Sequence, residues 1–252
     1  MVLACSDDPS DELYGPLRFE RPKIIYNDKT KQYVLWCHFV KYPGDHGFVD
    51  GTADAGVAVC DTVNGSYRWL GYQRPIDNVG FVRDCTVYKD MDGSAYFIYD
   101  RHVGKDFREG ADRCQYIVKL SDDYLGFTDE YKRMEAAYWR EAATMVYHEG
   151  YYYMITSGLT SWACNQARYA RATSILGEWE DMGDPCVGDD DETTFHSQGT
   201  YIFKVEGKAD TYIFMAERHN TENFLKSSYV WLPIEFLPDN KLRLVYKEIV
   251  EI

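Results

Sequence analysis

The sequence lacks long hydrophobic runs, an excess of positive charge and a sustained helical period. No stretch approaches the roughly 18 consecutive apolar residues of a membrane-spanning helix, so we expect no membrane insertion. Lysine and arginine number 27 against 41 acidic residues, giving a net charge of −14. Such a surface repels phosphate backbones, so we expect no nucleic acid partner. No segment repeats apolar residues at the helical period, so few helices are expected.

The cysteines show no CxxC pair and no spacing typical of a metal site. Seven are spread over positions 5, 37, 60, 85, 114, 164 and 186. A zinc site needs ligands closer together in the sequence, so we predict that these thiols are small buried hydrophobic groups. Met1–Cys5 is too short for a signal peptide, and we recognise no signal peptide in this chain.

Aromatic side chains are abundant, at 16% of the chain with 22 tyrosines. Tyrosine suits strands and sugar-facing surfaces because its ring has an apolar face and a polar tip. Short aromatic or β-branched runs, separated by turn signals such as Asp92-Gly93 and Glu149-Gly150, predict strands. These runs are Lys31–Phe39, Ala95–Tyr99, Tyr116–Leu120, Gly150–Ile155 and Asp210–Met215. The predicted fold class is all-β.

A repeated hairpin plan lies beneath these strands. Each copy has a polar residue, a short strand, a tight turn and an aromatic strand, and the copies begin at Glu20, Asp84, Glu141 and Gln198. These residues are 64, 57 and 57 positions apart. A period of roughly 50–60 residues built from hairpins is typical of a β-propeller. We therefore predict that residues 1–252 form a single β-propeller domain, which has four blades or begins inside a fifth.

The first strand of each blade lines the axis of a propeller, so the four repeat-opening residues are predicted to converge. Gathered carboxylates repel one another and raise each other's pKa, which stability alone does not favour. The alternative is that each side chain caps its own strand. Converging carboxylates suit glycoside hydrolysis, in which an inverting enzyme holds a proton donor and a base roughly 6.5–9.5 Å apart. Asp84 and Glu141, on adjacent blades, fit such a catalytic pair.

Motifs along the chain share the order and spacing of one known family. They are Glu20-Arg21-Pro22-Lys23, Arg83-Asp84, Leu120–Leu125, Arg140-Glu141-Ala142, Ser161-Trp162 with Asn165, Ser197-Gln198-Gly199-Thr200 and Tyr229–Ile234. Taken together, they resemble glycoside hydrolase family 43, in particular its exo-β-1,3-galactanase-like branch. The resemblance runs from about residue 6 to the C-terminus.

The resemblance implies a five-bladed β-propeller, with four complete blades visible and the N-terminal blade largely missing. It implies an inverting, exo-acting hydrolysis of β-1,3-linked galactan. Glu141 matches the general acid, Asp84 the aspartate that orients this acid and raises its pKa, and Gln198 a glutamine proposed to handle the water. A neutral amide is a poor base, so that role needs an unusual tautomer or a relay. Substrate contacts are implied for Glu20, Thr160, Trp162 and Asn165.

Further candidates come from single residues. Three carboxylates favour a positive partner, so Arg218 is predicted to clamp a sugar hydroxyl or to neutralise them. Trp139 and Trp162 either stack on sugar faces or belong to the core. No cofactor is expected to be required; the acidic run Gly188–Glu192 either holds a structural calcium or forms a solvated loop, since it lacks EF-hand spacing. His196 either faces the axis or sits in a loop.

The segment Asp100–Arg113 departs from the serine- and asparagine-rich loop of the family, which leaves the identity of the sugar open. The first interpretation is the galactanase. The second keeps the family but makes the chain an α-L-arabinofuranosidase, β-galactofuranosidase or β-xylosidase, and the third is a non-catalytic carbohydrate-binding propeller. The expected partner is an oligo- or polysaccharide in every case. Such polymers lie outside cells, so the resemblance implies an extracellular or cell-surface location.

Overall fold

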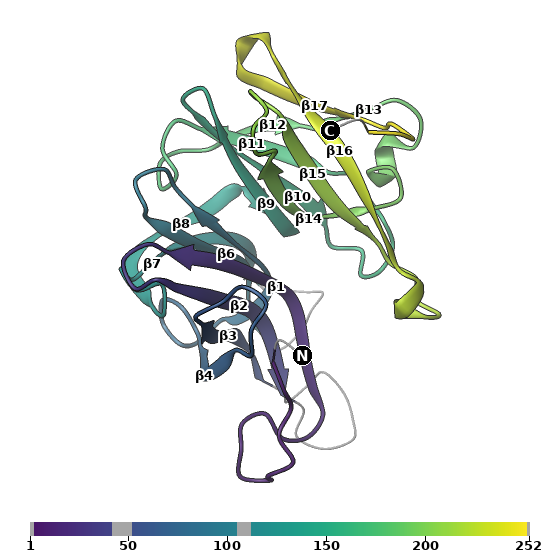
Figure 1. Ribbon diagram of the computed structural model, residues 1–252. Coiled ribbons are helices and arrows are strands. Elements are labelled where there is room, and N and C mark those ends of the chain that lie inside the picture. The colour runs from purple at the N-terminus through teal and green to yellow at the C-terminus, as the bar shows by residue number, and fades with distance from the viewer. Residues whose placement is uncertain (1–2, 42–51, 105–111, 251–252) are drawn as a thin grey trace. The chain divides into compact units, whose positions relative to one another are not determined.

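The computed structural model describes residues 3–41, 52–104 and 112–250, and nearly all regular structure in them is strand. Three segments of three residues each form 3-10 turns: Asp191–Thr193, Phe224–Lys226 and Pro238–Asn240. The all-β prediction is therefore confirmed. The chain divides into two compact units, Met1–Arg133 (unit 1) and Met134–Ile252 (unit 2), with the boundary inside strand β8. Figure 1 shows the strands of both units.

Unit 1 contains two four-stranded antiparallel sheets in which sequence neighbours pair. The first sheet runs in the order β1 (Leu17–Asn27), β2 (Gln32–Lys41), β3 (Thr52–Cys60) and β4 (Arg68–Gln73). The second runs in the order β5 (Phe81–Lys89), β6 (Ala95–Val103), β7 (Asp112–Leu120) and β8 (Phe127–Tyr138). This meander follows from short strands joined by tight turns.

Large aromatic side chains join the two sheets of unit 1. The ring of Trp36, from β2, lies 5.3 Å from that of Phe97 on β6 and 5.0 Å from that of Phe127 on β8. Trp36 is fully buried, and its indole N–H donates to the carbonyl of Tyr124 at 3.0 Å. Burial of the ring and satisfaction of its one donor explain why tryptophan suits this position.

Unit 2 contains a four-stranded and a five-stranded sheet. The first runs in the order β9 (Arg140–His148), β10 (Tyr151–Gly158), β11 (Arg168–Ala172) and β12 (Glu180–Gly183). The second runs in the order β14 (Gln198–Lys204), β15 (Tyr212–Arg218), β16 (Ser228–Leu237), β17 (Lys241–Val245) and β13 (Cys186–Val187). The β13–β17 pair is parallel, and the other pairs are antiparallel.

Local sequence explains the β9–β10 hairpin of unit 2. Glu149 and Gly150 form its two-residue turn, and both have positive φ, 42° and 89°. Such turns match the right-handed twist of the flanking strands, and glycine adopts positive φ at little cost. Beside the turn, the rings of His148 and Phe236 stack at 3.7 Å. The turn predicted at Glu149-Gly150 is confirmed.

The four sheets are of the blade type, and the first strand of each carries one repeat-opening residue. Residues 3–16 contribute only an isolated bridge between Ser6 and Tyr14. The predicted loss of an N-terminal blade stays a prediction, as does the single domain. Four of the seven cysteines are buried as expected, whereas Cys60 and Cys164 are half-buried and Cys5 is exposed. The described residues hold no helix long and apolar enough to cross a membrane.

Candidate active site

An irregularity marks the first strand of every sheet close to its polar residue. The pairing register shifts between Glu20 and Lys23 in β1 and between Val82 and Cys85 in β5. In unit 2 the shift lies opposite Ile155–Ser157 in the β9–β10 pair and between Gly199 and Tyr201 in β14. Each shift places one extra residue in the first strand, which is a β-bulge. A bulge re-aims side chains and ends regular pairing, and bulges are common beside active sites.

The bulges after Glu20 and Glu141 share an uncommon backbone conformation. Arg21 has φ of 54° and Ala142 has φ of 53°. Non-glycine residues adopt this left-handed region at a cost of about 1–2 kcal/mol, so the surrounding structure must hold it. Each glutamate thus lies directly before a strained residue, on the first strand of its sheet.

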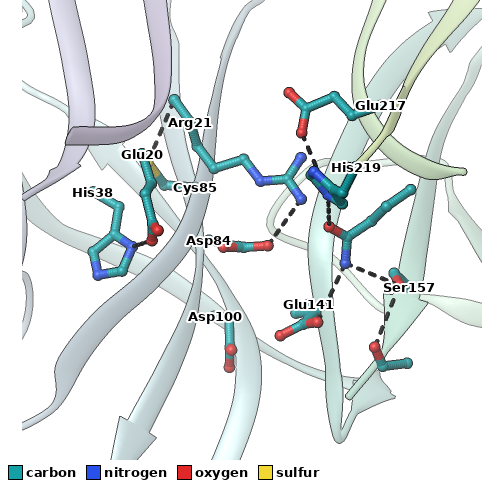
Figure 2. Close-up of polar contacts among 12 residues, drawn as sticks. Glu20, Arg21, His38, Asp84, Cys85, Asp100, Glu141, Ser157, Glu217 and His219 are labelled. Carbon is teal, nitrogen blue, oxygen red and sulfur yellow. Dashed lines mark hydrogen bonds and ion pairs between the residues drawn. The ribbon is translucent and has the colours of Figure 1, made fainter. Parts of the chain in front are cut away.

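In unit 1, two contacts organise the carboxylates of Glu20 and Asp84 (Figure 2). The guanidinium of Arg21 lies 3.0 Å from Asp84 Oδ2, and the Arg21 side chain is only 7% exposed. The carboxylate of Glu20 lies 3.0 Å from Nδ1 of the buried residue His38 on β2. The two acids that open the first two repeats therefore share one polar cluster, as the sequence predicts.

Charge neighbours hold both carboxylates of this cluster ionised. Burial alone would raise the pKa of Asp84, but the charges of Arg21, His38 and Arg113 outweigh it and the pKa is lowered. Burial would likewise raise the pKa of Glu20, and the contacts with His38 and Arg18 again lower it. The two side chains are therefore carboxylates at neutral pH.

Asp100 lies behind this cluster, opposite the bulge of β5. Its carboxylate is fully buried and accepts a hydrogen bond from Arg113 Nε at 2.7 Å. Burial raises the pKa of Asp100 to about 6, although Arg113 opposes the shift. The sequence placed Asp100–Val103 in an altered loop, which is wrong, because these residues end strand β6. Residues 105–111 of that predicted loop lie outside the described residues.

Glu20, His38 and Asp84 also form a candidate cation site. Each offers one ligand atom, and these atoms lie within 4.8 Å of one another. However, the guanidinium of Arg21 already supplies positive charge to Asp84 at 3.0 Å. The ion pair gives the cluster positive charge without a metal. A calcium ion in the acidic run 188–192 stays a prediction.

In unit 2, a hydrogen-bonded cluster joins Glu141 to Gln198; Figure 2 shows Glu141, Ser157 and His219 of this cluster. Strands β9 and β14 contact each other, and the Gln198 amide nitrogen donates to Glu141 Oε1 at 3.2 Å. The same nitrogen donates to Ser157 Oγ, also at 3.2 Å. Glu141 and Gln198 are therefore in direct contact. This is closer than the roughly 6.5–9.5 Å that separates the two carboxyl groups of an inverting pair.

Arg140 anchors the strand that carries Glu141. Its guanidinium donates to the carbonyls of Thr156 and Gln166, both at 2.8 Å, which ties β9 to β10 and to the segment before β11. Burial, together with the charge of Arg168, lowers the pKa of Arg140 to about 10. Arg140 remains a cation at neutral pH, so Glu141 follows a fixed positive charge.

The predicted sugar-contacting residues 160–165 form a loop next to this cluster. Asn165 donates to Gly158 O and to Thr160 Oγ1, and its Oδ1 accepts from Gly158 N at 2.6 Å. Thr160 donates in turn to Ala163 O. The polar groups of Asn165 and Thr160 thus hold the loop. Trp162 is 47% exposed, so it lies outside the core, whereas Trp139 is half-buried.

The ring of Trp162 contacts an imidazole that the sequence gives no reason to single out. The rings of Trp162 and His219 meet edge-on at 5.1 Å. His219 Nε2 lies 3.4 Å from Gln198 Oε1 and 3.8 Å from Glu217 Oε2 (Figure 2). His219 follows strand β15, whose residue Glu217 pairs with Gln198 in the sheet. This strand pairing is what brings the imidazole to the amide.

Arg218 and His196 have local partners in unit 2. Arg218 donates to the carbonyl of Phe195 at 2.9 Å and lies over the ring of Tyr246. His196 is exposed and lies 3.3 Å from the carboxylate of Asp190, in the loop rather than in the Glu141 cluster. Of the two sequence interpretations of His196, the loop position is confirmed. The role of Arg218 toward sugar or carboxylates stays a prediction.

The structure brings the predicted residues together as two pairs, Glu20 with Asp84 in unit 1 and Glu141 with Gln198 in unit 2. The convergence of all four stays a prediction, and so do their catalytic roles. Sequence reasoning missed Arg21, although it directly follows Glu20 and a positive partner was expected. Other residues that it missed are His38, Asp100, Ser157, Glu217 and His219.

Each of the four sheets carries a carboxyl or amide group on its first strand. The model of glycosyl hydrolases family 43 matches residues 22–241, and the chain belongs to this family. It is therefore a glycosidase, an enzyme that hydrolyses O-glycosyl bonds. Among curated proteins, no match was found.

Several solved structures of family members resemble the chain closely. The β-1,3-galactosidase BT3683, solved with galactodeoxynojirimycin, is 29% identical with a TM-score of 0.88, over 100% of this chain and 82% of that one. The β-1,3-galactosidase BT0265 is 31% identical with a TM-score of 0.84, over 98% of this chain and 50% of that one. The exo-β-1,3-galactanase 1,3Gal43A from Clostridium thermocellum is 29% identical with a TM-score of 0.71, over 91% and 49%. The chain thus spans about half the length of the last two proteins.

Proposed function

We propose that this chain is an inverting, exo-acting glycosidase that releases galactose from β-1,3-linked galactan. The observation that carries the proposal is the Glu141–Gln198 hydrogen bond on neighbouring first strands of unit 2. It joins a carboxyl group to an amide at the positions where the galactanase-like branch has its acid and its water-handling glutamine. The β-1,3-galactosidases and galactanase that match the chain support the choice of substrate.

The proposed roles follow from what each group can do. Glu141 donates a proton to the leaving oxygen, which is the general-acid step. Gln198 orients the attacking water through its carbonyl oxygen. This oxygen takes the proton of the water while Nε2 passes its own proton to Glu141 Oε1, since Glu141 has given its acid proton to the leaving oxygen. Arg21 holds Asp84 ionised, and the resemblance implies that Asp84 is the aspartate that orients the acid. Glu20 contacts the sugar, and the exposed ring of Trp162 offers a stacking face.

The test compares the parent protein with Glu141→Gln on β-1,3-galactan, with galactose release followed by chromatography. Loss of general-acid catalysis is expected to lower turnover by about 10²–10⁴-fold. A dinitrophenyl galactoside carries a leaving group that needs no proton, so on this substrate the variant should lose far less. The anomer released first, read by proton NMR, should be α, since inversion of a β linkage gives the α-sugar.

Glu149→Gln is the matched control, because Glu149 is an exposed glutamate in the turn of the same β9–β10 hairpin. It should keep the parent's turnover, and circular dichroism should show all three proteins folded. Turnover only on aryl arabinofuranosides, galactofuranosides or xylosides would replace galactan as the substrate. Sugar binding without turnover on any glycoside would refute catalysis by this chain.

The location of the enzyme is part of the proposal. Enzymes of this family are typically secreted or surface-associated. Galactan polymers lie outside cells, so we propose an extracellular or cell-surface location for this chain. We expect no cofactor to be required, and turnover in the presence of a chelator at the parent rate would agree with that.

A further inference from the structure

The directions of the hydrogen bonds around Gln198 follow from the backbone N–H and C=O groups of Gly158. Gly158 N donates to Asn165 Oδ1 at 2.6 Å, and Asn165 Nδ2 donates back to Gly158 O at 3.0 Å. A backbone N–H only donates and a carbonyl only accepts, so the orientation of the Asn165 amide is fixed. Oδ1 of Asn165 is therefore an acceptor.

The orientation of the Asn165 amide sets the direction of the hydrogen bonds of Ser157. Ser157 Oγ lies 3.2 Å from Asn165 Oδ1 and 3.3 Å from Gly158 O. Both atoms accept, and the serine hydroxyl donates on that side. Toward Gln198, Ser157 Oγ then accepts from the amide nitrogen, Nε2, at 3.2 Å. The carbonyl oxygen of Gln198 consequently points the other way.

The carbonyl oxygen of Gln198 meets His219. Oε1 lies 3.4 Å from His219 Nε2, and because a carbonyl oxygen only accepts, Nε2 must carry the hydrogen. The distance is long for an N–H···O bond, and such contacts often tighten when substrate binds. The carboxylate of Glu217, 3.8 Å from the same nitrogen, favours the hydrogen there.

We infer that His219 is a positioning residue, which holds the Gln198 amide with its nitrogen on Glu141 and its oxygen toward the water site. This inference rests on the proposed function. With the amide in this orientation, Glu141 Oε1 always accepts a hydrogen bond, so the acid proton must lie on Oε2. In a flipped amide, the carbonyl oxygen of Gln198 would face Glu141 Oε1 and would accept a hydrogen bond from the acid proton of Glu141. His219 thus keeps that proton available for the leaving oxygen.

The test uses two substitutions that separate hydrogen bonding from packing. His219→Phe keeps a ring against Trp162 but removes the N–H. His219→Gln places an amide N–H near the position of Nε2 but removes the ring. One hydrogen bond shifts the ratio of the two amide orientations by about tenfold. A ratio that falls from about ten to one to about one to one leaves about half of the amides flipped, so we expect kcat to fall about twofold in His219→Phe with KM unchanged. We expect His219→Gln to recover most of kcat.

A double-mutant cycle tests whether His219 acts through Gln198. In the Gln198→Ala background, His219→Phe should cause no further loss of kcat, because no amide remains to be oriented. His196→Phe is the control, since this exposed imidazole pairs with Asp190 and its loss should leave kcat unchanged. Additive losses in the cycle, or recovery by Phe and not by Gln, would overturn the inference and assign His219 to packing.

An NMR measurement that needs no catalytic turnover separates this inference from the proposed function. In the nitrogen-15 spectrum, the side-chain amide pair of Gln198 is identified by its absence from Gln198→Ala. We expect the pair to shift or broaden in His219→Phe and to stay sharp in His219→Gln. If the parent hydrolyses no glycoside, the proposed function fails while this arm still decides the orientation. Unchanged Gln198 signals in His219→Phe would refute the positioning role.

Discussion

Replacing Arg21 by glutamine removes the positive partner of Asp84 and leaves a largely buried carboxylate behind. The Arg21 and Asp84 side chains are 7% and 20% exposed, and their charged atoms lie 3.0 Å apart. Removing one partner of a buried pair costs about 3–5 kcal/mol. The partial exposure of Asp84 places the expected loss near about 3 kcal/mol at pH 7. For a unit of this size, that lowers the midpoint of thermal unfolding by about 10 °C.

The loss from Arg21→Gln should depend on pH in a defined direction. In the parent, the pKa of Asp84 is below its ordinary value of 3.8. The stabilisation from a lowered carboxyl pKa is present above the unfolded pKa, and it disappears as pH falls through the folded pKa. In the variant, burial raises the pKa of Asp84 instead, so the variant regains stability as pH falls and the carboxyl group becomes protonated. The stability difference between parent and variant should therefore narrow from pH 7 to pH 4.

Arg18→Gln is the control for this prediction. Arg18 pairs with Glu20 at 3.3 Å on the same strand, but both side chains are about one-third exposed. Exposed pairs contribute about 0–1 kcal/mol, so the Arg18 variant should melt within a few degrees of the parent. Thermal unfolding followed by circular dichroism at pH 7, 5.5 and 4 measures all three proteins. Equal losses in both variants, or a loss for Arg21→Gln that does not change with pH, would refute the argument.

Two further substitutions test other parts of the structure. Burial raises the pKa of Asp100 to about 6, so the folded parent should lose stability as pH rises from about 4 through about 6. Asp100→Asn should remove about 3 kcal/mol of this pH dependence in thermal unfolding. An unchanged pH profile in the variant would contradict the prediction. In Gly199→Ala, the new Cβ would lie 2.9 Å from the ring of the fully buried Phe214. This overpacking should cost about 1–3 kcal/mol and disturb Gln198, so both the unfolding midpoint and turnover should fall, and parent-like values would show that the ring yields.

The strands and the repeat could be predicted because their signals are local. Aromatic and β-branched runs coincide with β2, β6, β7, β10 and β15, and Glu149-Gly150 supplies the turn that its positive φ angles require. The spacing of the polar residues located the first strand of each sheet. Glu20, Asp84, Glu141 and Gln198 all lie on those strands, so the periodicity predicted the order of the sheets, while the site that these residues would form stays a prediction.

The partners of these residues could not be predicted, because they depend on bulges and strand pairing. Arg21, which reaches Asp84, itself has a positive φ, and nothing in the sequence Glu-Arg-Pro-Lys indicates that conformation. His219 reaches Gln198 because β15 pairs with β14. A need for positive charge was recognised, and the sequence pointed to Arg218, whose role toward sugar or carboxylates stays a prediction; Arg21 was not singled out.

The choice of an amide at position 198 follows from its distance to Glu141. A second carboxylate 3.2 Å from Glu141 would repel it whenever both were ionised, whereas an amide nitrogen donates to Glu141 in either protonation state. The amide has its own weakness, because its two ends are nearly equal in shape and a flip exchanges donor for acceptor. Ser157 accepts at one end and His219 donates at the other, so the surrounding groups select one orientation. A neutral residue beside the proposed acid is therefore useful only together with the partners that orient it.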